Sequence, residues 1–418
     1  MNLRQSFNHS KASPARTAVR GAALLPQCDG SVQWLPDAWL AWQDGRLCEV
    51  RAATADDRLV TQTATLYLPG LIDLHCHWPQ SHVRGQFGGA LLPWLREAIW
   101  PAEAAFADPQ VAEERAKTFL NEILRAGTVG GLFFGPPNVQ ASALLLALAP
   151  PSFFDGPALM MRHAPAELLT PVAQMLAEME ELPADITKRL AVTPRFAPNV
   201  DADGLRACAE AMAKHGWPAQ SHVSENLDEI KWVAELFPLA KSYLDVYAEA
   251  GLLGPHTVLA HGVHLGPKDW ELLAQTGTWL AHCPTSNQAL GSGRMPLEQA
   301  KAHGVRWVLA TDVGAGPLLS QLDCMGALLQ VHQGHCSVNA CEALAHASAI
   351  PGEFLAQFDP DLKGLGQLAI GAPAHIIGVP RPAGDDAESV LQELLQTPRN
   401  LLESLPTQVF YAGHALLT

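Results

Sequence analysis

Short apolar runs alternate with longer amphipathic stretches through the middle of the chain, between residues 71 and 312. The apolar runs have the length of buried strands, and the stretches between them, such as 111–125 and 227–236, have the periodicity of helices. Parallel strands that alternate with helices in this way close into a (β/α)8 barrel, an α/β fold. The eight predicted strands are 71–75, 128–134, 158–162, 190–195, 219–223, 258–261, 279–282 and 305–311.

The two ends of the chain have a different pattern. Both contain short strand-like pieces separated by turns, of which Asp44-Gly45 is one example. We expect them to form one small β-sandwich domain from residues 17–66 and 365–418. The TIM-like barrel would then occupy residues 67–364, and residues 1–16 would be a loose tail.

Composition and charge narrow the class of protein. The 418 residues are enough for one barrel and one smaller domain. The chain has 27 basic and 42 acidic residues, a net charge of -15, which argues against binding to nucleic acid or to an anionic membrane. Eight cysteines without a Cys-x-x-Cys pair, and no apolar secretory segment, predict reduced thiols in a cytoplasmic protein.

Side chains that bind metals follow several of the predicted strands. His75 and His77 are two residues apart on one strand, so their imidazoles leave the same face. His222, His261 and Asp312 end three further strands, and the carboxyl ends of barrel strands meet at one face. Nitrogen donors with one carboxylate suit zinc or another borderline divalent metal, which makes hydroxide available near neutral pH.

Glu225 is the candidate proton shuttle, because a loop position three residues after His222 could reach both water and substrate. His261 could hold the water or polarise the attacked group, and Asp312 could act as ligand and base. Simpler structural roles remain open for these residues. His222 could be a core histidine, Glu225 could cap the following helix through Ser224, and Asp312 could make an Asx turn.

Several motifs together resemble the amidohydrolase superfamily, and more narrowly its bacterial guanine deaminases. The resemblance covers about residues 69–316, and the ends of the chain match only loosely. The superfamily motifs are Pro69-Gly70-Leu71-Ile72-Asp73-x-His75-x-His77, Ser221-His222-x-Ser224-Glu225, Ala260-His261-Gly262 and Thr311-Asp312. The narrower motifs include His77-Trp78-Pro79-Gln80, Leu92-Pro93-Trp94-Leu95, Thr193-Pro194-Arg195-Phe196-Ala197-Pro198 and Cys283-Pro284-Thr285-Ser286-Asn287.

The resemblance implies hydrolytic deamination of guanine to xanthine and ammonia by a zinc-bound hydroxide, in purine catabolism or salvage. It implies one zinc ion per subunit, with iron as the alternative metal, and a homodimer. Glu225 would shuttle the proton, and His261 would contact the hydrolytic water. The implied metal ligands are His75, His77, His222 and Asp312.

Gln80 and the pair Arg195-Phe196 are implied to recognise the base. The arginine fork suits a carbonyl oxygen, the glutamine amide offers a donor and an acceptor, and the phenyl ring can stack on a purine. Without the resemblance, a salt bridge at the barrel mouth would be an equally good role for Arg195. The remaining expected substrate contacts are His77, His222, Glu225 and Asp312.

Three places depart from the family pattern. After Gly316 the chain reads Pro317-Leu318-Leu319, where the family usually has small polar residues, and this change beside the metal could reshape the pocket. Trp78 is bulkier and less polar than the residue expected there, and His375 stands where an aspartate is usual. Two alternative functions stay open, namely deamination of another heterocycle such as a pterin or triazine, and a catalytically inactive barrel relative. A nucleic-acid editor is disfavoured, because the His-x-Glu and Pro-Cys-x-x-Cys signature of those deaminases is missing.

Overall fold

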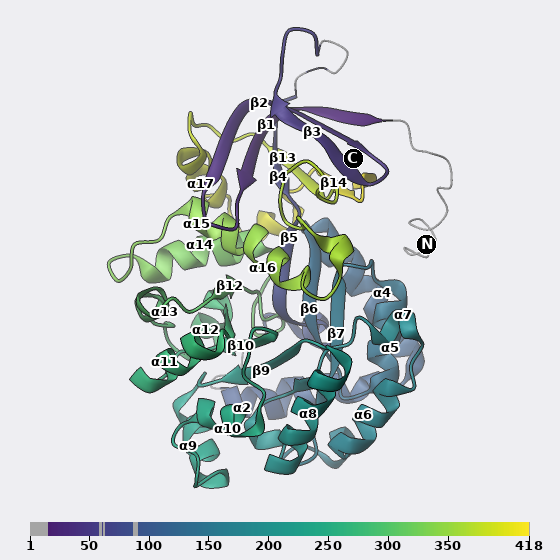
Figure 1. The fold of residues 1–418 in the computed structure, drawn as a ribbon, viewed down its shortest axis with the longest axis vertical. Helices are drawn as coiled ribbons and strands as arrows, with labels where there is room; N and C mark the ends of the chain where they lie inside the picture. The colour runs from purple at the N-terminus through teal and green to yellow at the C-terminus, as the bar shows by residue number, and fades with distance from the viewer. Residues whose placement is uncertain (1–15, 58–60, 62, 87–90, 418) are drawn as a thin grey trace.

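The structure is a computed structural model that describes residues 16–57, 61, 63–86 and 91–417. Its main body is a barrel of parallel strands with helices around it, and a second sheet lies against one end of that body (Figure 1). The predicted α/β barrel is confirmed. Its strands are β5 Leu71–His77, β6 Thr128–Gly135, β7 Phe153–Leu159, β8 Thr193–Pro194, β9 Ala219–Val223, β10 Thr257–His261, β11 Trp279–His282 and β12 Trp307–Leu309.

The barrel is built from two parallel half-barrels, ordered β5-β6-β7-β8 and β12-β11-β10-β9. A parallel bridge between Val192 and Ala219 joins β8 to β9 at one seam. At the other seam the backbone N–H of Asp312 donates to the carbonyl of His75 at 2.9 Å. This second seam brings two of the expected metal ligands together through their own backbone.

Helices follow the strands and cover the outside of the barrel (Figure 1). The helix predicted at 227–236 has those same bounds, and the one predicted at 111–125 begins two residues earlier, at Pro109. The α-helices are α2 Leu91–Trp94, α3 Trp100–Ala104, α4 Pro109–Arg125, α5 Val139–Leu148, α6 Val172–Glu180, α7 Ala184–Thr187, α8 Ala202–His215, α9 Leu227–Leu236, α10 Tyr243–Ala250, α11 Pro267–Thr276, α12 Pro284–Ala289, α13 Leu297–His303, α14 Gln321–His332, α15 Ala340–His346, α16 Ala349–Leu355 and α17 Ala387–Leu395. Short helical turns are η1 Trp78–Val83, η2 Leu95–Ile99, η3 Ala105–Ala107, η4 Ala166–Leu168, η5 Ala197–Asn199, η6 Pro360–Leu362 and η7 Arg399–Ser404.

The third barrel strand lies earlier in the chain than predicted. The prediction placed it at 158–162, whereas β7 begins at Phe153 and ends at Leu159. The Asp-Gly-Pro sequence at 155–157 has the composition of a turn and obscured the strand. Gly156 is needed inside the strand, because a Cβ atom there would lie 2.6 Å from the Thr193 methyl group of β8.

Strands from both ends of the chain form one seven-stranded mixed sheet, in the order β15-β14-β13-β4-β1-β2-β3. β4 lies between the N-terminal strands β1 to β3 and the C-terminal strands β13 to β15. It runs parallel to β1 and antiparallel to β13. The strands are β1 Thr17–Pro26, β2 Val32–Gln43, β3 Arg46–Ala52, β4 Thr65–Pro69, β13 Ile376–Pro380, β14 Gln408–Tyr411 and β15 His414–Leu417.

The expectation of a small domain built from both ends is confirmed, but a single sheet takes the place of the expected sandwich. The Trp42 ring on β2 lies 5.1 Å from the Phe410 ring on β14, although β2 and β14 are not neighbours in the sheet. The sheet is therefore curled. Curling buries an apolar face that a sandwich would have buried between two sheets. The domain boundaries at 66/67 and 364/365 remain a prediction.

Three further expectations concern the cysteines, membrane-spanning helices and the N-terminal tail. All eight cysteines are free thiols. Within the described residues, none of the helices has the length and apolar character that a membrane crossing requires. The tail expected at residues 1–16 falls outside the described residues, except for Arg16.

Candidate active site and metal centre

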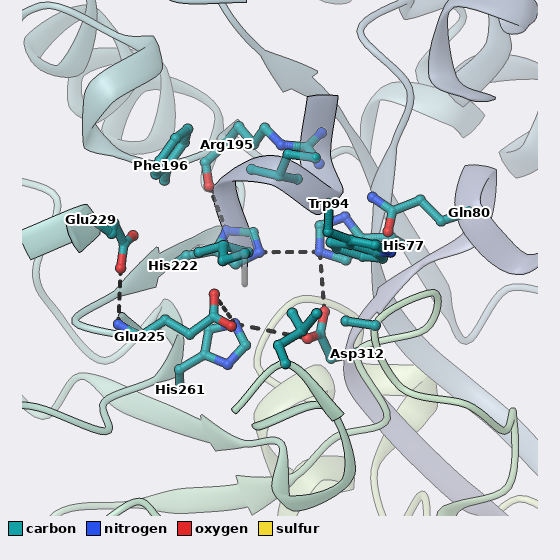
Figure 2. Close-up of a pocket in the computed structure, with 14 residues that line it drawn as sticks. His77, Gln80, Trp94, Arg195, Phe196, His222, Glu225, Glu229, His261 and Asp312 are labelled. Carbon is teal, nitrogen blue, oxygen red and sulfur yellow. Dashed lines mark hydrogen bonds and ion pairs between the residues drawn. The ribbon is translucent and has the colours of Figure 1, made fainter. Parts of the chain in front are cut away.

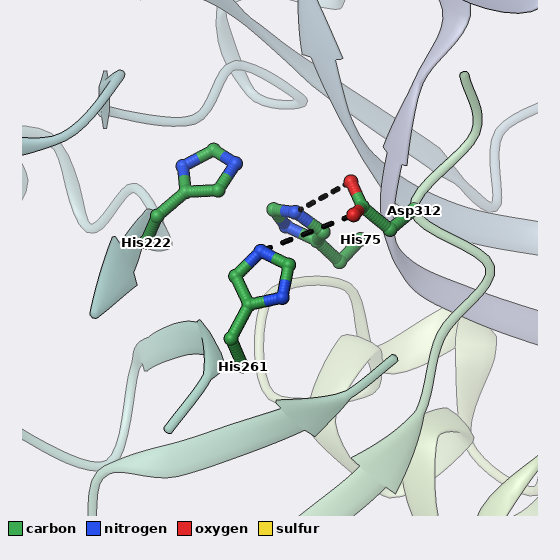
Figure 3. Close-up of side chains that lie close together, drawn as sticks. All are labelled: His75, His222, His261 and Asp312. Atoms are coloured by element: carbon green, nitrogen blue, oxygen red, sulfur yellow. Dashed lines mark ion pairs between the residues drawn. The ribbon is translucent and has the colours of Figure 1, made fainter. Parts of the chain in front are cut away.

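Four side chains from separate strands of the barrel meet at its carboxyl end (Figure 3). His75, His222 and His261 come from β5, β9 and β10, and Asp312 follows β12. One ligand atom from each lies within 4.8 Å of the ligand atoms of the others. His261 and Asp312 have positive φ angles of 75° and 49°, so the chain turns sharply where these strands end.

His77 lies beside this group as a fifth donor. Its Nε2 atom is 3.1 Å from His222 Nε2 and 3.4 Å from Asp312 Oδ1. The compact group of four therefore contains His261, where the sequence led us to expect His77. All five side chains lie close enough together to share one metal centre. The expected ligand set contained four of them and left out His261.

Hydrogen bonds set which ring nitrogen faces the centre. His222 Nδ1 lies 2.5 Å from the carbonyl oxygen of Arg195, and His261 Nδ1 lies 2.9 Å from Asn287 Oδ1. Each oxygen accepts an N–H, so the Nδ1 atoms carry the hydrogens. The Nε2 lone pairs of both rings then point inward, as second-shell contacts commonly arrange for metal ligands.

The charge states also suit a cation. Burial lowers the pKa of His75, and it lowers the pKa values of His77 and His222 well below their usual range, so these rings are neutral near pH 7. Burial opposes the charged form of Asp312 as well, yet contacts with His75 and other histidines bring its pKa down to about 2. Neutral imidazoles beside a carboxylate are the protonation states that metal binding requires.

Unpartnered buried atoms indicate that the centre needs a further group. His75 Nε2 and His261 Nε2 lie 3.3 and 3.9 Å from the Asp312 carboxylate (Figure 3), but neither of these atoms, nor His75 Nδ1, makes a hydrogen bond within the described part of the chain. A buried polar atom without a partner costs about 1–3 kcal/mol, so such atoms are rare unless they bind something else. These residues therefore fit a divalent metal, and they form a metal site.

Glu225 lies in the loop between β9 and α9, with its carboxylate turned toward the centre (Figure 2). Its Oε2 atom is 3.5 Å from His261 Nε2, and its Oε1 atom accepts a 3.0 Å hydrogen bond from the Ser292 hydroxyl. Burial, followed by the charge of Asp312, raises the pKa of Glu225.

Other residues provide the cap of α9. Asn226 is the N-cap residue, and the Glu229 carboxylate accepts the backbone N–H of Glu225 at 3.0 Å. The alternative role of Glu225 as a helix cap is therefore not realised. Its carboxylate is available to a substrate or a water molecule.

The residues expected to recognise a base line the same pocket as His77, His222, His261 and Asp312 (Figure 2). The space between its lining side chains, together with the part open to solvent, is about 410 Å³. Gln80, Arg195 and Phe196 line one side of it, and apolar side chains from α2 and η2 help to close it. Trp78, which departs from the family pattern, lies outside it and packs its ring 5.0 Å from that of Phe106.

Sequence reasoning missed three polar residues of this region. Glu229 lines the pocket, Ser292 contacts Glu225, and Glu103 on α3 accepts hydrogen bonds from Gln80 and Arg195. Arg195 thus also makes the salt bridge that we had considered as its structural role. The only signal for Glu103 was a single charged residue within the apolar stretch 99–106.

Comparison with known proteins places this site in a family. The family model described as "Amidohydrolase family" matches residues 66–399. The chain belongs to the amidohydrolase family. Within that family, guanine deaminase of Escherichia coli (strain K12) is 34% identical over 332 residues, which are 77% of this chain and 73% of the relative.

Solved structures of family members have the same fold. The structure of E. coli guanine deaminase superimposes with a TM-score of 0.86 at 26% identity, over 96% of this chain and 99% of that one. Guanine deaminase from C. acetobutylicum, a structure with guanine bound in its active site, has a TM-score of 0.84 at 23% identity, over 96% and 100% of the two chains. The predicted membership among the guanine deaminases of this family is confirmed.

Proposed function

We propose that this protein hydrolyses guanine to xanthine and ammonia, with one zinc ion per subunit held by His75, His77, His222 and Asp312. The strongest support is that four of the five metal-type donors (all except the fully buried His75), Glu225 and the expected base-recognition residues line one pocket. The E. coli relative is a guanine deaminase, and the C. acetobutylicum relative holds guanine in its active site.

Zinc suits the donor set because its usual protein ligands are imidazole nitrogens and carboxylate oxygens. When bound, zinc lowers the pKa of water and so makes a nucleophile available near neutral pH. His77 contacts Asp312 Oδ1, whereas His261 Nε2 lies 3.9 Å from Asp312 Oδ2, and from this position the His261 imidazole can orient the attacking water.

Glu225 moves the proton in the proposed reaction. Its Oε2 atom carries one proton from the attacking water to a ring nitrogen, and then carries the second, from the new hydroxyl group at C2, to the leaving amino group. A carboxyl group with a raised pKa suits this task, because it must both accept and release a proton near neutral pH. A C–O bond forms at C2 of guanine, the C–N bond to the amino group breaks, and ammonia leaves.

The other side of the pocket holds the base. Arg195 and Gln80 donate hydrogen bonds to the carbonyl oxygen of guanine, and Phe196 packs against the ring. This arrangement turns the amino group at C2 toward Glu225 and the metal-type donors. Substrate and nucleophile are then held together in a reactive geometry.

The test is ammonia release from guanine by the purified, zinc-loaded protein. We expect Glu225→Gln to lower kcat by about 100- to 10,000-fold, since that is the usual contribution of a general acid and base. Glu235→Gln makes the same change on the exposed side of α9 and should keep the wild-type rate. Elemental analysis should find one zinc per chain.

Isoxanthopterin, adenine and cytosine serve as competing substrates. Turnover of one of these but not of guanine would keep the reaction and contradict the proposed substrate. No turnover of any substrate by a zinc-loaded, folded protein would contradict the proposed function and favour the inactive relative.

A further inference from the structure

An acidic side chain lies behind the two residues that we propose hold the carbonyl oxygen of the base. Glu103 on α3 is 2% exposed. Gln80 Nε2 donates to Glu103 Oε1 at 2.8 Å, and Arg195 Nη1 donates to Oε1 and Oε2 at 2.8 and 2.6 Å. One carboxylate therefore binds both residues of the recognition site.

The side-chain amide of Gln80 is held at both of its ends. The carboxylate of Glu103 accepts hydrogen bonds, so it selects the NH2 end, Nε2. The backbone N–H of Gly314 only donates, and it lies 3.3 Å from the other end, Oε1. If the amide turned over, oxygen would face the carboxylate and NH2 would face an N–H. The two contacts together fix the donor end of Gln80.

Arg195 is fixed by the same carboxylate. Its side chain is 5% exposed, and within the described residues its side-chain hydrogen bonds both leave from Nη1. Arg195 lines the pocket, and its remaining guanidinium nitrogens are left to bind a ligand. A guanidinium has donors only, so this part of the pocket cannot accept a hydrogen bond.

We propose that Glu103 is a positioning residue that makes the pocket select purines with an oxygen at position 6 over purines with an amino group there. The inference rests on the proposed function. By fixing Gln80 and Arg195, Glu103 presents N–H donors to the base. An oxygen accepts these hydrogen bonds, whereas an amino group turns its own hydrogens toward them and leaves buried donors unpaired.

The experiment compares guanine with 2,6-diaminopurine, which carries an amino group at position 6. In Glu103→Gln the neutral amide no longer dictates which end of Gln80 faces it, so that side chain can turn over. We expect the ratio of kcat/KM values, guanine over 2,6-diaminopurine, to fall by at least about 10-fold, a fraction of the discrimination that a fixed polar site can supply. A purely structural role would lower both kcat/KM values by the same factor.

Asp323→Asn is the matched control. Asp323 on α14 accepts two hydrogen bonds from Arg399, at 2.7 and 2.6 Å, so the variant makes the same carboxylate-to-amide change beside an arginine. Asp323 does not line the pocket, and the substrate ratio of this variant should equal that of the wild type. Thermal unfolding of both variants measures their loss of stability independently.

If Glu103→Gln does not fold, the same comparison of the two substrates is made with Glu103→Asp. The shorter side chain keeps the charge beside Arg195 but cannot reach both partners, so the ratio should fall to an intermediate value. An unchanged ratio in whichever variant folds would overturn the role of Glu103, even if guanine turnover by the wild type supports the proposed function. A wild-type protein that does not turn over guanine would overturn both.

Discussion

At the scale of single residues, a serine hydroxyl holds the proposed proton shuttle in place. Ser292 donates to Glu225 Oε1 at 3.0 Å, which leaves Oε2 directed toward His261. The backbone of Ser292 is fixed separately, because its carbonyl accepts from His264 Nε2 at 2.9 Å. The hydroxyl can therefore be removed without releasing the loop.

We expect Ser292→Ala to lower kcat for guanine by about 10- to 150-fold and to leave KM nearly unchanged, since a hydrogen bond to a charged group contributes about 1.5–3 kcal/mol. Steady-state kinetics would measure this effect. Ser348→Ala is the control, because it removes another buried hydroxyl, one that bonds the Leu344 carbonyl at 2.6 Å. Equal kcat values for Ser292→Ala and the wild type would show that Glu225 needs no such support.

The metal-type residues could be predicted from the sequence, because each one ends an apolar run and barrel strands end at a common face. Glu103 and Ser292 could not be predicted in this way. Glu103 lies on a five-residue helix and Ser292 in a loop, and both reach the site only through packing of distant segments. Local pattern carries no information on such contacts.

At the scale of elements, Gly70 joins the small sheet to the barrel. It lies between β4 and β5, and its N–H donates to the His375 carbonyl at 3.0 Å. A Cβ atom at this position would lie 3.0 Å from Val129 Cβ on β6, and closer still to the Val129 methyl groups. Only glycine allows the two elements to approach this closely.

Gly70→Ala should lower the free energy of unfolding by about 1–3 kcal/mol, the usual cost of overpacking a filled interior. Urea denaturation followed by circular dichroism measures it. Gly254→Ala is the control, since a Cβ atom there meets no atom of the described chain within 4 Å. Its effect should be at most about 1 kcal/mol in either direction, the usual size of a Gly-to-Ala change where the added methyl group has room. Similar losses in both variants would contradict this explanation.

Helices with a clear amphipathic period were predicted well. For example, the predicted and observed bounds of α9 are the same. β7 was misplaced because its Asp-Gly-Pro sequence has the local preference of a turn, and tertiary contact with β8 overrides that preference. The curled sheet could not be foreseen, because the contact between Trp42 and Phe410 joins segments that share no local pattern.

At the scale of the whole molecule, buried neutral histidines make stability depend on pH. His375 lies beside the junction with the barrel, where its Nδ1 atom accepts the backbone N–H of Ala412 at 2.9 Å. Burial lowers the pKa of His375 to about 3, and burial likewise lowers the pKa of His346 to about 3. Above pH of about 6.5 these side chains are neutral in both the folded and the unfolded chain.

Below that pH these histidines become protonated in the unfolded chain but stay neutral in the folded chain. The free energy of unfolding should therefore fall as the pH decreases from about 6.5 toward 3, by about 1.4 kcal/mol per pH unit for each such histidine. Urea titrations between pH 8 and 5 would measure the slope. His375→Asn can keep an acceptor for Ala412 and should give a shallower slope; an equal slope would exclude His375 as a source.

The sheet that joins both ends of the chain has a consequence for biosynthesis. β4 pairs with β1 on one side, but its other partner, β13, is translated about 300 residues later. During that interval the nascent polypeptide exposes an unpaired strand edge, which is a template for pairing with other chains. Asp312 is likewise translated long after His75 and His77 of β5, so the metal site also forms late. Protection by chaperones should matter most at this stage of synthesis on the ribosome.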